Sequence, residues 1–203
     1  MKYSLSGVIL AGGMSKRFSG KEKALLTVGE SRIIDRIFAI FQEIFEEIIL
    51  VTNNPLCFLE WNANIVTDIF SIRSALTGIH AGLFYSTYSH AFFCACDTPF
   101  LKKEIVNYVI SCVTPKLDVI LPATSAGLEP LCAVYSKNIL PAIEKHLSTG
   151  DYKIAHAIKK CRIHRIPESE LRYRDPKLLS FFNVNTPEDL KKAKEIESKI
   201  KYL

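Results

Sequence analysis

Apolar runs alternate with amphipathic stretches through the first half of the chain, and this alternation predicts a parallel sheet flanked by helices. The runs that predict strands are rich in β-branched and aliphatic residues and cover residues 7–11, 48–52, 64–67 and 90–96. Apolar residues at helical spacing predict one helix that follows Ser31, its expected N-cap, and extends to about residue 48, and a second over residues 75–85. The first half therefore indicates an α/β fold.

The pattern becomes mixed in the second half. A helix is expected over residues 102–113, ending before Pro115 because the residue that precedes a proline avoids helical geometry. Extended segments are expected at residues 118–121, 128–136, 162–166 and 181–184, short helices at 137–147 and 151–160, and a loop at 167–180. Thr186 and Pro187 give a clear start signal for a C-terminal helix, because Thr is a favoured cap and Pro a favoured first residue.

The composition changes the picture little. The 203 residues are 48% hydrophobic and 23% charged, which suits one globular domain with a sizeable core. The net charge of +5 is compatible with a polyanionic small substrate and does not require nucleic acid. No apolar run approaches the ~20 residues that span a bilayer, and the first run is too short for a signal peptide. We therefore expect a cytoplasmic protein without membrane or nucleic-acid partners.

The six cysteines are scattered, and several lie in apolar runs, which favours buried free thiols. Cys94 and Cys96 would lie on one face of a strand. The chain has no second close pair of cysteines and no paired histidine motif to complete a tetrahedral site, so we do not expect thiolates to hold a metal.

Candidate chemistry begins where the first strand ends, at Gly12 and Gly13. Paired glycines let the backbone turn sharply and bring its N–H groups against an anion. Four cationic side chains follow, at Lys16, Arg17, Lys21 and Lys23. The segment fits neither the Walker loop nor the dinucleotide fingerprint. It predicts a long loop that wraps a nucleotide triphosphate, and the alternative is a strand end followed by a solvated basic loop.

Asp97 directly follows the predicted strand at residues 90–96. The carboxyl ends of parallel strands meet at one edge of a sheet, so Asp97 should lie near the glycine-rich loop. Proteins often hold Mg²⁺ with one or two carboxylates while substrate phosphates and waters fill the other positions. Asp97 is therefore a candidate magnesium ligand, with a cap or turn residue before Pro99 as the alternative.

Three blocks of the sequence together resemble the signature blocks of the molybdenum cofactor guanylyltransferases. They are Leu-Ala-Gly-Gly at residues 10–13 with Arg17 and Lys23 behind it, Cys-Asp-Thr-Pro-Phe at 96–100, and Asn-Val-Asn-Thr-Pro-Glu-Asp-Leu at 183–190. The blocks follow one another in the family's order over nearly the whole chain, although many nucleotidyltransferases share the first one. The resemblance implies a single Rossmann-like three-layer domain over residues 1–203, with a mostly parallel sheet, helices on both faces and a mixed C-terminal part.

The resemblance also implies an activity. The enzyme would transfer the guanylyl group of Mg-GTP to the terminal phosphate of molybdopterin, giving molybdopterin guanine dinucleotide and pyrophosphate. Mg²⁺ would be the cofactor, and the partners would be GTP, molybdopterin or the molybdenum cofactor, and chaperones specific to molybdoenzymes. We expect a monomer.

Site residues follow from matching positions in the family's motifs. The residues implied for GTP binding are Leu10, Ala11, Gly12, Gly13, Lys23, Thr52, Asp68 and Asp97. Arg17, Lys23 and Asp97 would be catalytic, and Asp97 would bind the metal. Asn183 and Asn185 would serve the molybdopterin side.

Other interpretations of these residues stay open. Asp68 would otherwise be a strand-end turn residue, and Asn183 and Asn185 would otherwise satisfy local backbone groups. The chain departs from the family at Thr52, where an asparagine is frequent, and before the third helix, where Ser74 and Ala75 replace Gly-Pro.

Two further functions compete with guanylyl transfer. One is transfer of another nucleotide, by a cytidylyl-transferring cousin acting on molybdopterin or by an enzyme that acts on a sugar phosphate; the cousins usually carry Ala where Gly12 stands. The other is a non-catalytic carrier that binds the pterin cofactor in the same groove and presents it to partner enzymes.

Overall fold

The computed structural model describes residues 3–12, 18 and 22–201. Its main sheet has the strand order β10-β7-β9-β6-β1-β4-β5, with β8 paired to β7. The strands are β1 (Tyr3–Leu10), β4 (Phe45–Val51), β5 (Asn64–Val66), β6 (His90–Ala95), β7 (Val119–Thr124), β8 (Gly127–Leu128), β9 (Cys132–Ser136) and β10 (Ile163–Pro167). Strands β5, β4, β1 and β6 are parallel, while β9 runs antiparallel to both β6 and β7. The predicted α/β fold, with a mostly parallel sheet that becomes mixed toward the C-terminus, is confirmed.

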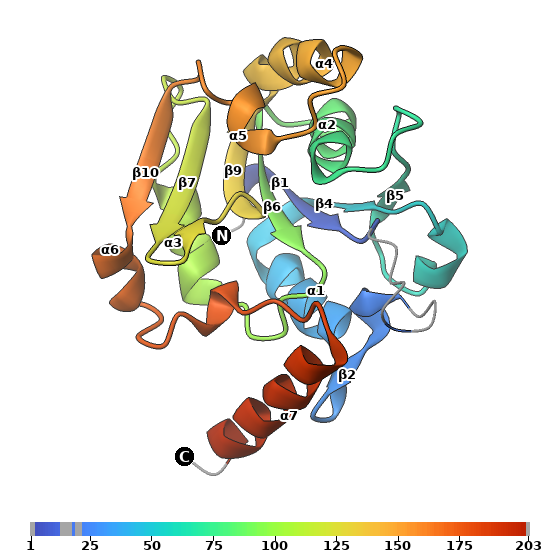
Figure 1. Ribbon diagram of the computed structural model, residues 1–203, viewed down its shortest axis with the longest axis vertical. Helices are drawn as coiled ribbons and strands as arrows, with labels where there is room; N and C mark the ends of the chain where they lie inside the picture. Colours follow the sequence, from blue (N-terminus) through green and yellow to red (C-terminus); the bar gives the residue numbers. More distant parts are fainter. Residues whose placement is uncertain (1–2, 13–17, 19–21, 202–203) are drawn as a thin grey trace.

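Helices cover both faces of this sheet (Figure 1). The helices are α1 (Ile33–Ile44), α2 (Ala75–Tyr85), α3 (Lys103–Ser111), α4 (Leu140–Ser148), α5 (Ile154–Ala157), α6 (Glu168–Arg172) and α7 (Pro187–Lys201). Helices α1 and α3 pack on one face, and α2, α4 and α5 pack on the other. The three layers expected from the sequence are therefore present. No helix in the described ranges is long and apolar enough to cross a membrane.

Each face of the sheet has its own hydrophobic core. On the α1 face, Phe41, Phe45 and Phe92 form an aromatic cluster with ring centroids 4.9 to 6.0 Å apart. On the opposite face, α2 approaches the sheet closely at Gly82, where an added Cβ would lie 2.6 Å from Phe93 Cε1 and 2.7 Å from Val8 Cγ1. Glycine is favoured here because a side chain would overlap Phe93 and Val8 in the core.

The structure corrects several element boundaries. Helix α1 begins at Ile33 and ends at Ile44, so Ser31 is not its cap and Phe45 starts the next strand. Ser31 instead belongs to a hairpin that the sequence analysis missed, formed by β2 (Thr27–Val28) and β3 (Ser31–Arg32) around Gly29, which has a φ of +64°.

Two expectations for residues 167–184 are wrong. Residues 181–184 form no strand, since η5 (Leu179–Phe181) is a short 3-10 helix and irregular chain follows it. The predicted loop also contains α6. The C-terminal helix is confirmed at its start, where Thr186 Oγ1 accepts from the N–H of Asp189 and an Asp189 carboxylate oxygen accepts from the N–H of Thr186.

All six cysteines have free thiols. Cys94, Cys96 and Cys132 are buried near the ends of β6 and β9, and the other three are half-buried. Burial raises the pKa of each of the three buried thiols above its usual range, so they are protonated at neutral pH and behave as small apolar side chains.

Candidate active site

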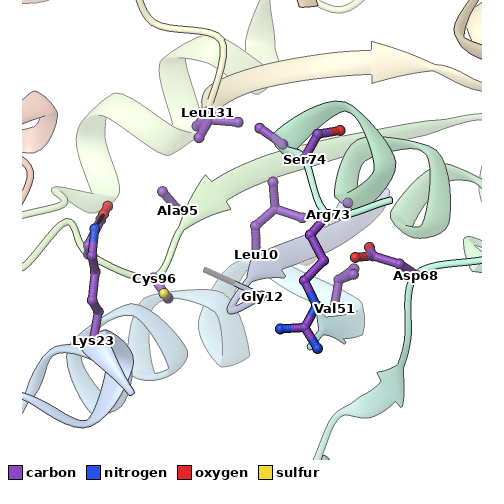
Figure 2. Close-up of a pocket in the computed structure, with 13 residues that line it drawn as sticks. Leu10, Gly12, Lys23, Val51, Asp68, Arg73, Ser74, Ala95, Cys96 and Leu131 are labelled. Atoms are coloured by element: carbon purple, nitrogen blue, oxygen red, sulfur yellow. Dashed lines mark hydrogen bonds and ion pairs between the residues drawn. The ribbon is translucent and has the colours of Figure 1, made fainter. Parts of the chain in front are cut away.

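A pocket with a volume of about 430 Å³ opens where β1, β4 and β6 end (Figure 2). We name it the strand-edge pocket. Five of the predicted site residues line it, namely Leu10, Gly12, Lys23, Asp68 and Asp97. The start of α2 provides another wall, through Arg73, Ser74 and Gly78. The expectation that the end of the first strand and Asp97 meet at one edge of the sheet is therefore confirmed.

Main-chain hydrogen bonds hold this edge together. The N–H of Ala11 donates to Val51 O at 2.8 Å, the N–H of Thr52 donates to Val66 O at 2.9 Å, and the N–H of Cys96 donates to Leu10 O at 3.1 Å. These bonds extend the ladders of β1, β4 and β6 by one residue each, so Ala11, Thr52 and Cys96 have fixed positions at this edge.

Thr52 is fully buried at this edge, and its hydroxyl contacts the main chain. Its Oγ1 donates to Ala11 O at 3.3 Å and accepts from the N–H of Asn54 at 3.1 Å. Thr52 lines a smaller neighbouring pocket together with Ala11, Gly12 and Asn53. The hydroxyl thus fixes the main chain at Ala11, directly before Gly12.

Asp97 and Lys23 form an ion pair in the strand-edge pocket, with 3.1 Å between Lys23 Nζ and Asp97 Oδ2. Lys23 lies in η2 (Lys23–Leu25), and Nζ also donates to Asn185 Oδ1 at 2.6 Å. The main chain holds Asp97 from its other side, because its carbonyl accepts from the N–H of Val184 at 2.8 Å. Lys23, Asp97 and Asn185 thus form one cluster, although 162 residues separate its ends along the chain.

Asp68 lies at the opposite end of the pocket. Asn53 Nδ2 donates to its Oδ2 at 2.8 Å. Burial raises the pKa of Asp68, and the hydrogen bond from Asn53 and the positive charge of Arg73 oppose that rise. Figure 2 shows the Arg73 side chain extending from the start of α2 toward Gly12. A carboxylate, an amide and a guanidinium therefore surround one end of the pocket, where they could form hydrogen bonds with a polar ring or a ribose.

A second pocket, with a volume of about 220 Å³, adjoins the first. We name it the side pocket. Ala95, Asp97 and Leu131 line both pockets, so Asp97 stands between them. Asn183 and Asn185 line the side pocket, as does Glu129. Asn183 Nδ2 makes a long hydrogen bond of 3.4 Å to Phe181 O, whereas Asn185 accepts from Lys23.

Two predicted residues, Gly13 and Arg17, lie outside the described residues, as do Lys16 and Lys21. The sequence analysis did not name Asn53, Arg73 or Glu129 as site residues. Each of these residues follows a strand or precedes a helix. Neither its distance in sequence from the motif residues nor the residues next to it in the chain distinguish it from an ordinary loop residue.

Two pockets that share a carboxylate at the carboxyl edge of a wound sheet are typical of an enzyme that binds two ligands there and brings them together. A lysine beside that carboxylate and a glycine just beyond the end of β1 suit a phosphorylated ligand. The fold and site thus define the class of nucleotide-binding α/β enzymes.

The chain belongs to the family of MobA-like NTP transferases, since residues 7–166 match the model described as the MobA-like NTP transferase domain. It is 43% identical over 190 residues to the molybdenum cofactor guanylyltransferase of Desulfosudis oleivorans, covering 94% of each chain. Its fold is similar to the crystal structure of molybdopterin-guanine dinucleotide biosynthesis protein A from Archaeoglobus fulgidus, with a TM-score of 0.85, 26% identity, and coverage of 96% of this chain and 100% of that chain.

The fold extends to more distant nucleotidyltransferases. The 2-C-methyl-D-erythritol 4-phosphate cytidylyltransferase of Thermus thermophilus has a TM-score of 0.69 and 14% identity, with coverage of 98% of this chain and 100% of that chain. At that identity the similarity shows the shared fold alone.

Proposed function

We propose that this protein is a molybdenum cofactor guanylyltransferase, which transfers GMP from GTP to the terminal phosphate of molybdopterin and releases pyrophosphate. The activity named for the Desulfosudis oleivorans relative supports this proposal. The observation that carries it is the position of Asp97, which lines both pockets and thus lies where two substrates would meet. Residues 1–203 would act as one nucleotidyltransferase domain.

In this proposal GTP occupies the strand-edge pocket. Lys23 binds its phosphates, because an ammonium group has three N–H donors and contacts with Asp97 and Asn185 use two of them. Leu10, Ala11 and Gly12 present main-chain groups to the nucleotide, and Thr52 holds that main chain in place. Asp68 accepts hydrogen bonds from the base or the ribose. Gly13 and Arg17 belong to the proposal through the family's motif alone.

Molybdopterin occupies the side pocket, with Asn183 and Asn185 on its wall. The attacking group is a phosphate monoester, whose second pKa is about 6, so at neutral pH it is largely a dianion and needs no general base. The protein must instead align two anions and neutralise their charge. Lys23 does so at the boundary of the two pockets, where negative charge moves onto the leaving pyrophosphate.

The residues near Asp97 fit Mg²⁺. A carboxylate oxygen is a hard ligand of the kind that Mg²⁺ prefers, and within the described ranges no group of three or more His, Cys, Asp or Glu forms a complete metal cage. Substrate phosphates and water would therefore fill most of the coordination sphere. Asp97 would hold the ion, and a bound Mg²⁺ would polarise and neutralise the phosphates.

The experiment that tests the proposal supplies purified protein and molybdopterin with GTP, CTP or ATP in the presence of Mg²⁺. We expect molybdopterin guanine dinucleotide as the product and a kcat/KM for GTP at least ~10-fold above those for CTP and ATP, because buried groups that pair with guanine stay unpaired with another base. Equal use of CTP would overturn the guanylyl assignment. Tight binding of molybdopterin without any product would favour a carrier.

A further inference from the structure

Glu129 places a carboxylate on the wall of the side pocket, where neither the family motifs nor the proposed steps use it. It lies in the turn between β8 and β9 and is half-buried. Leu131 also lines this pocket, as do Phe181 and Asn183 from the segment that precedes α7. An acidic group, an amide and apolar surface thus surround a small space beside Asp97.

The turn that carries Glu129 is held on both sides. The N–H of Glu129 donates to Pro122 O at 3.0 Å, and its carbonyl accepts from the N–H of Cys132 at 3.1 Å. The carbonyl of the next residue, Pro130, accepts from the hydroxyl of the buried Tyr135 at 2.7 Å. These hydrogen bonds fix the main chain from which the Glu129 side chain extends, and a specific contact with a ligand requires such a fixed position.

The Glu129 carboxylate has unused hydrogen-bonding capacity. Thr124 Oγ1 donates to its Oε1 at 3.1 Å. A carboxylate offers about four lone-pair sites, so both oxygens can accept further N–H donors. The described residues that line the pocket include no lysine or arginine, and burial raises the pKa of Glu129. A ligand with paired N–H donors would therefore satisfy this carboxylate, whereas a phosphate would be repelled by it.

We propose that Glu129 determines acceptor specificity by accepting two parallel hydrogen bonds from the N3–H and 2-amino groups of the pterin ring of molybdopterin. The inference rests on the proposed function, and it names the group that would recognise the heterocycle. The faces of the ring would lie between Leu131 and Phe181, because flat heterocycles pack well on apolar and aromatic surfaces. The terminal phosphate would then lie toward Asp97 and Lys23.

The same donor pair occurs on guanine, so a test must tell the two rings apart. In an E129Q variant the side-chain carbonyl can still accept from Thr124, but one of the two acceptors for the ring is replaced by a donor. We expect the KM for molybdopterin to rise at least ~10-fold and the KM for GTP to change less than ~2-fold, because only the acceptor ring loses a charged partner. A rise in the KM for GTP alone, or no change in either constant, would overturn the inference.

A binding experiment gives a readout that does not depend on the transfer reaction. The probes are 6-hydroxymethylpterin and 6-hydroxymethyllumazine, followed by their fluorescence; lumazine carries an oxygen in place of the 2-amino group. We expect the unmodified protein to prefer the pterin by ~10-fold or more and E129Q to lose that preference. Equal binding of the two probes by the unmodified protein would overturn the inference. Pterin selectivity without any product from GTP and molybdopterin would instead count against the proposed function alone.

Thr124 supplies a matched control. Its hydroxyl contacts the Glu129 carboxylate, and the described lining of the side pocket does not include Thr124. Its hydroxyl also accepts from the N–H of Ala126, so T124V should lower the thermal stability of the β7–β8 hairpin. If Glu129 recognises the ring directly, T124V leaves both KM values unchanged. If T124V and E129Q raise the KM for molybdopterin equally, Glu129 acts only by holding the hairpin, and the inference is wrong.

Discussion

Replacement of Gly12 by alanine should separate ligand binding from stability. A Cβ built at Gly12 would have Asn53 Nδ2 as its nearest described neighbour, at 3.5 Å, which is an ordinary van der Waals distance. Gly12 is also not among the described glycines with a positive φ, so alanine can adopt its backbone conformation. At a compatible site, Gly→Ala stabilises a protein by about 0.4–1 kcal/mol through the unfolded chain. We therefore expect the Tm of G12A to rise by about 1–4 °C.

The same methyl group would project into space that the nucleotide needs, because Gly12 lines both the strand-edge pocket and its smaller neighbour. We expect kcat/KM for GTP to fall at least ~10-fold, which corresponds to about 1.4 kcal/mol of transition-state stabilisation. The matched control is G82A, whose Cβ would clash with Phe93 and Val8 at 2.6 and 2.7 Å. Overpacking of that kind costs about 1–3 kcal/mol, so its Tm should fall by about 2–12 °C.

The assay combines differential scanning fluorimetry with steady-state kinetics on both variants. G82A should keep the KM for GTP of the unmodified protein at temperatures where it is folded, since Gly82 lies on the core side of α2. G12A should show the opposite result, with higher stability and weaker use of GTP. Unchanged kinetics in G12A would refute the argument that the nucleotide contacts Gly12, and a large loss of stability would refute the account of its packing.

Three further predictions concern charged groups. D97N should fold, with a Tm no more than a few degrees lower, because a partly exposed ion pair contributes about 0–1 kcal/mol to stability. Its kcat should nevertheless fall at least ~100-fold. Near-normal turnover in saturating Mg²⁺ would contradict the proposed role of Asp97. K23A should weaken GTP binding in a titration and lower kcat as well, and if both were unaffected Lys23 would be a solvated loop residue. Hydrogen bonds from Arg162 lower the pKa of Asp118 from 3.8 to about 2, so the pair stabilises the fold above the unfolded-state pKa and loses this effect as the pH falls through about 2. D118N should therefore be less stable than the unmodified protein by at most about 2 kcal/mol at pH 7, and chemical denaturation should show the difference shrinking below pH 4; a difference independent of pH would contradict the charge argument.

The α/β order of the chain could be predicted from periodicity, but one boundary could not. Phe45 and Ile48 continue the apolar spacing of α1, so the pattern predicts a longer helix. The structure ends the helix at Ile44 because β4 pairs with β1 from Phe45 onward, with Phe45 opposite Tyr3. The strand begins with Phe45, an exposed Glu46 and a half-buried Glu47 before Ile48, so its first apolar positions coincide with the helical spacing and no change of period marks where it begins.

Residues 181–184 show a second limit of local patterns. Their apolar composition is typical of a strand, but a strand also needs a neighbour with free backbone groups along its length. Here one main-chain bond, from Val184 N–H to Asp97 O, connects the segment to the end of β6. Residues 181–184 thus hold Asp97 in place through this hydrogen bond. The family motif that contains Asn183 and Asn185 lies on this irregular stretch.

The site was predictable where a strand end fixes a residue. Gly12 and Asp97 lie two residues beyond the ends of β1 and β6, and the rule that ligands bind at the carboxyl ends of strands places them together. Glu129 and Arg73 lie on loops whose paths depend on packing elsewhere, such as the bond from Tyr135 to Pro130. No spacing in the sequence brings those loops to the same edge of the sheet.

The position of Asp97 explains why residues from distant parts of the chain meet at one point. In a transfer between two anionic substrates, the attacking and leaving oxygens lie on opposite sides of the phosphorus, so the stabilising groups must reach both sides. Asp97 lines both pockets, and Lys23 connects it to Asn185 on the side pocket. Asn185 lies beyond residue 166, where the match to the family domain ends. The last segment therefore contributes to the boundary between the two pockets as well as to the wall of the side pocket, and it fixes Asp97 through the hydrogen bond from Val184.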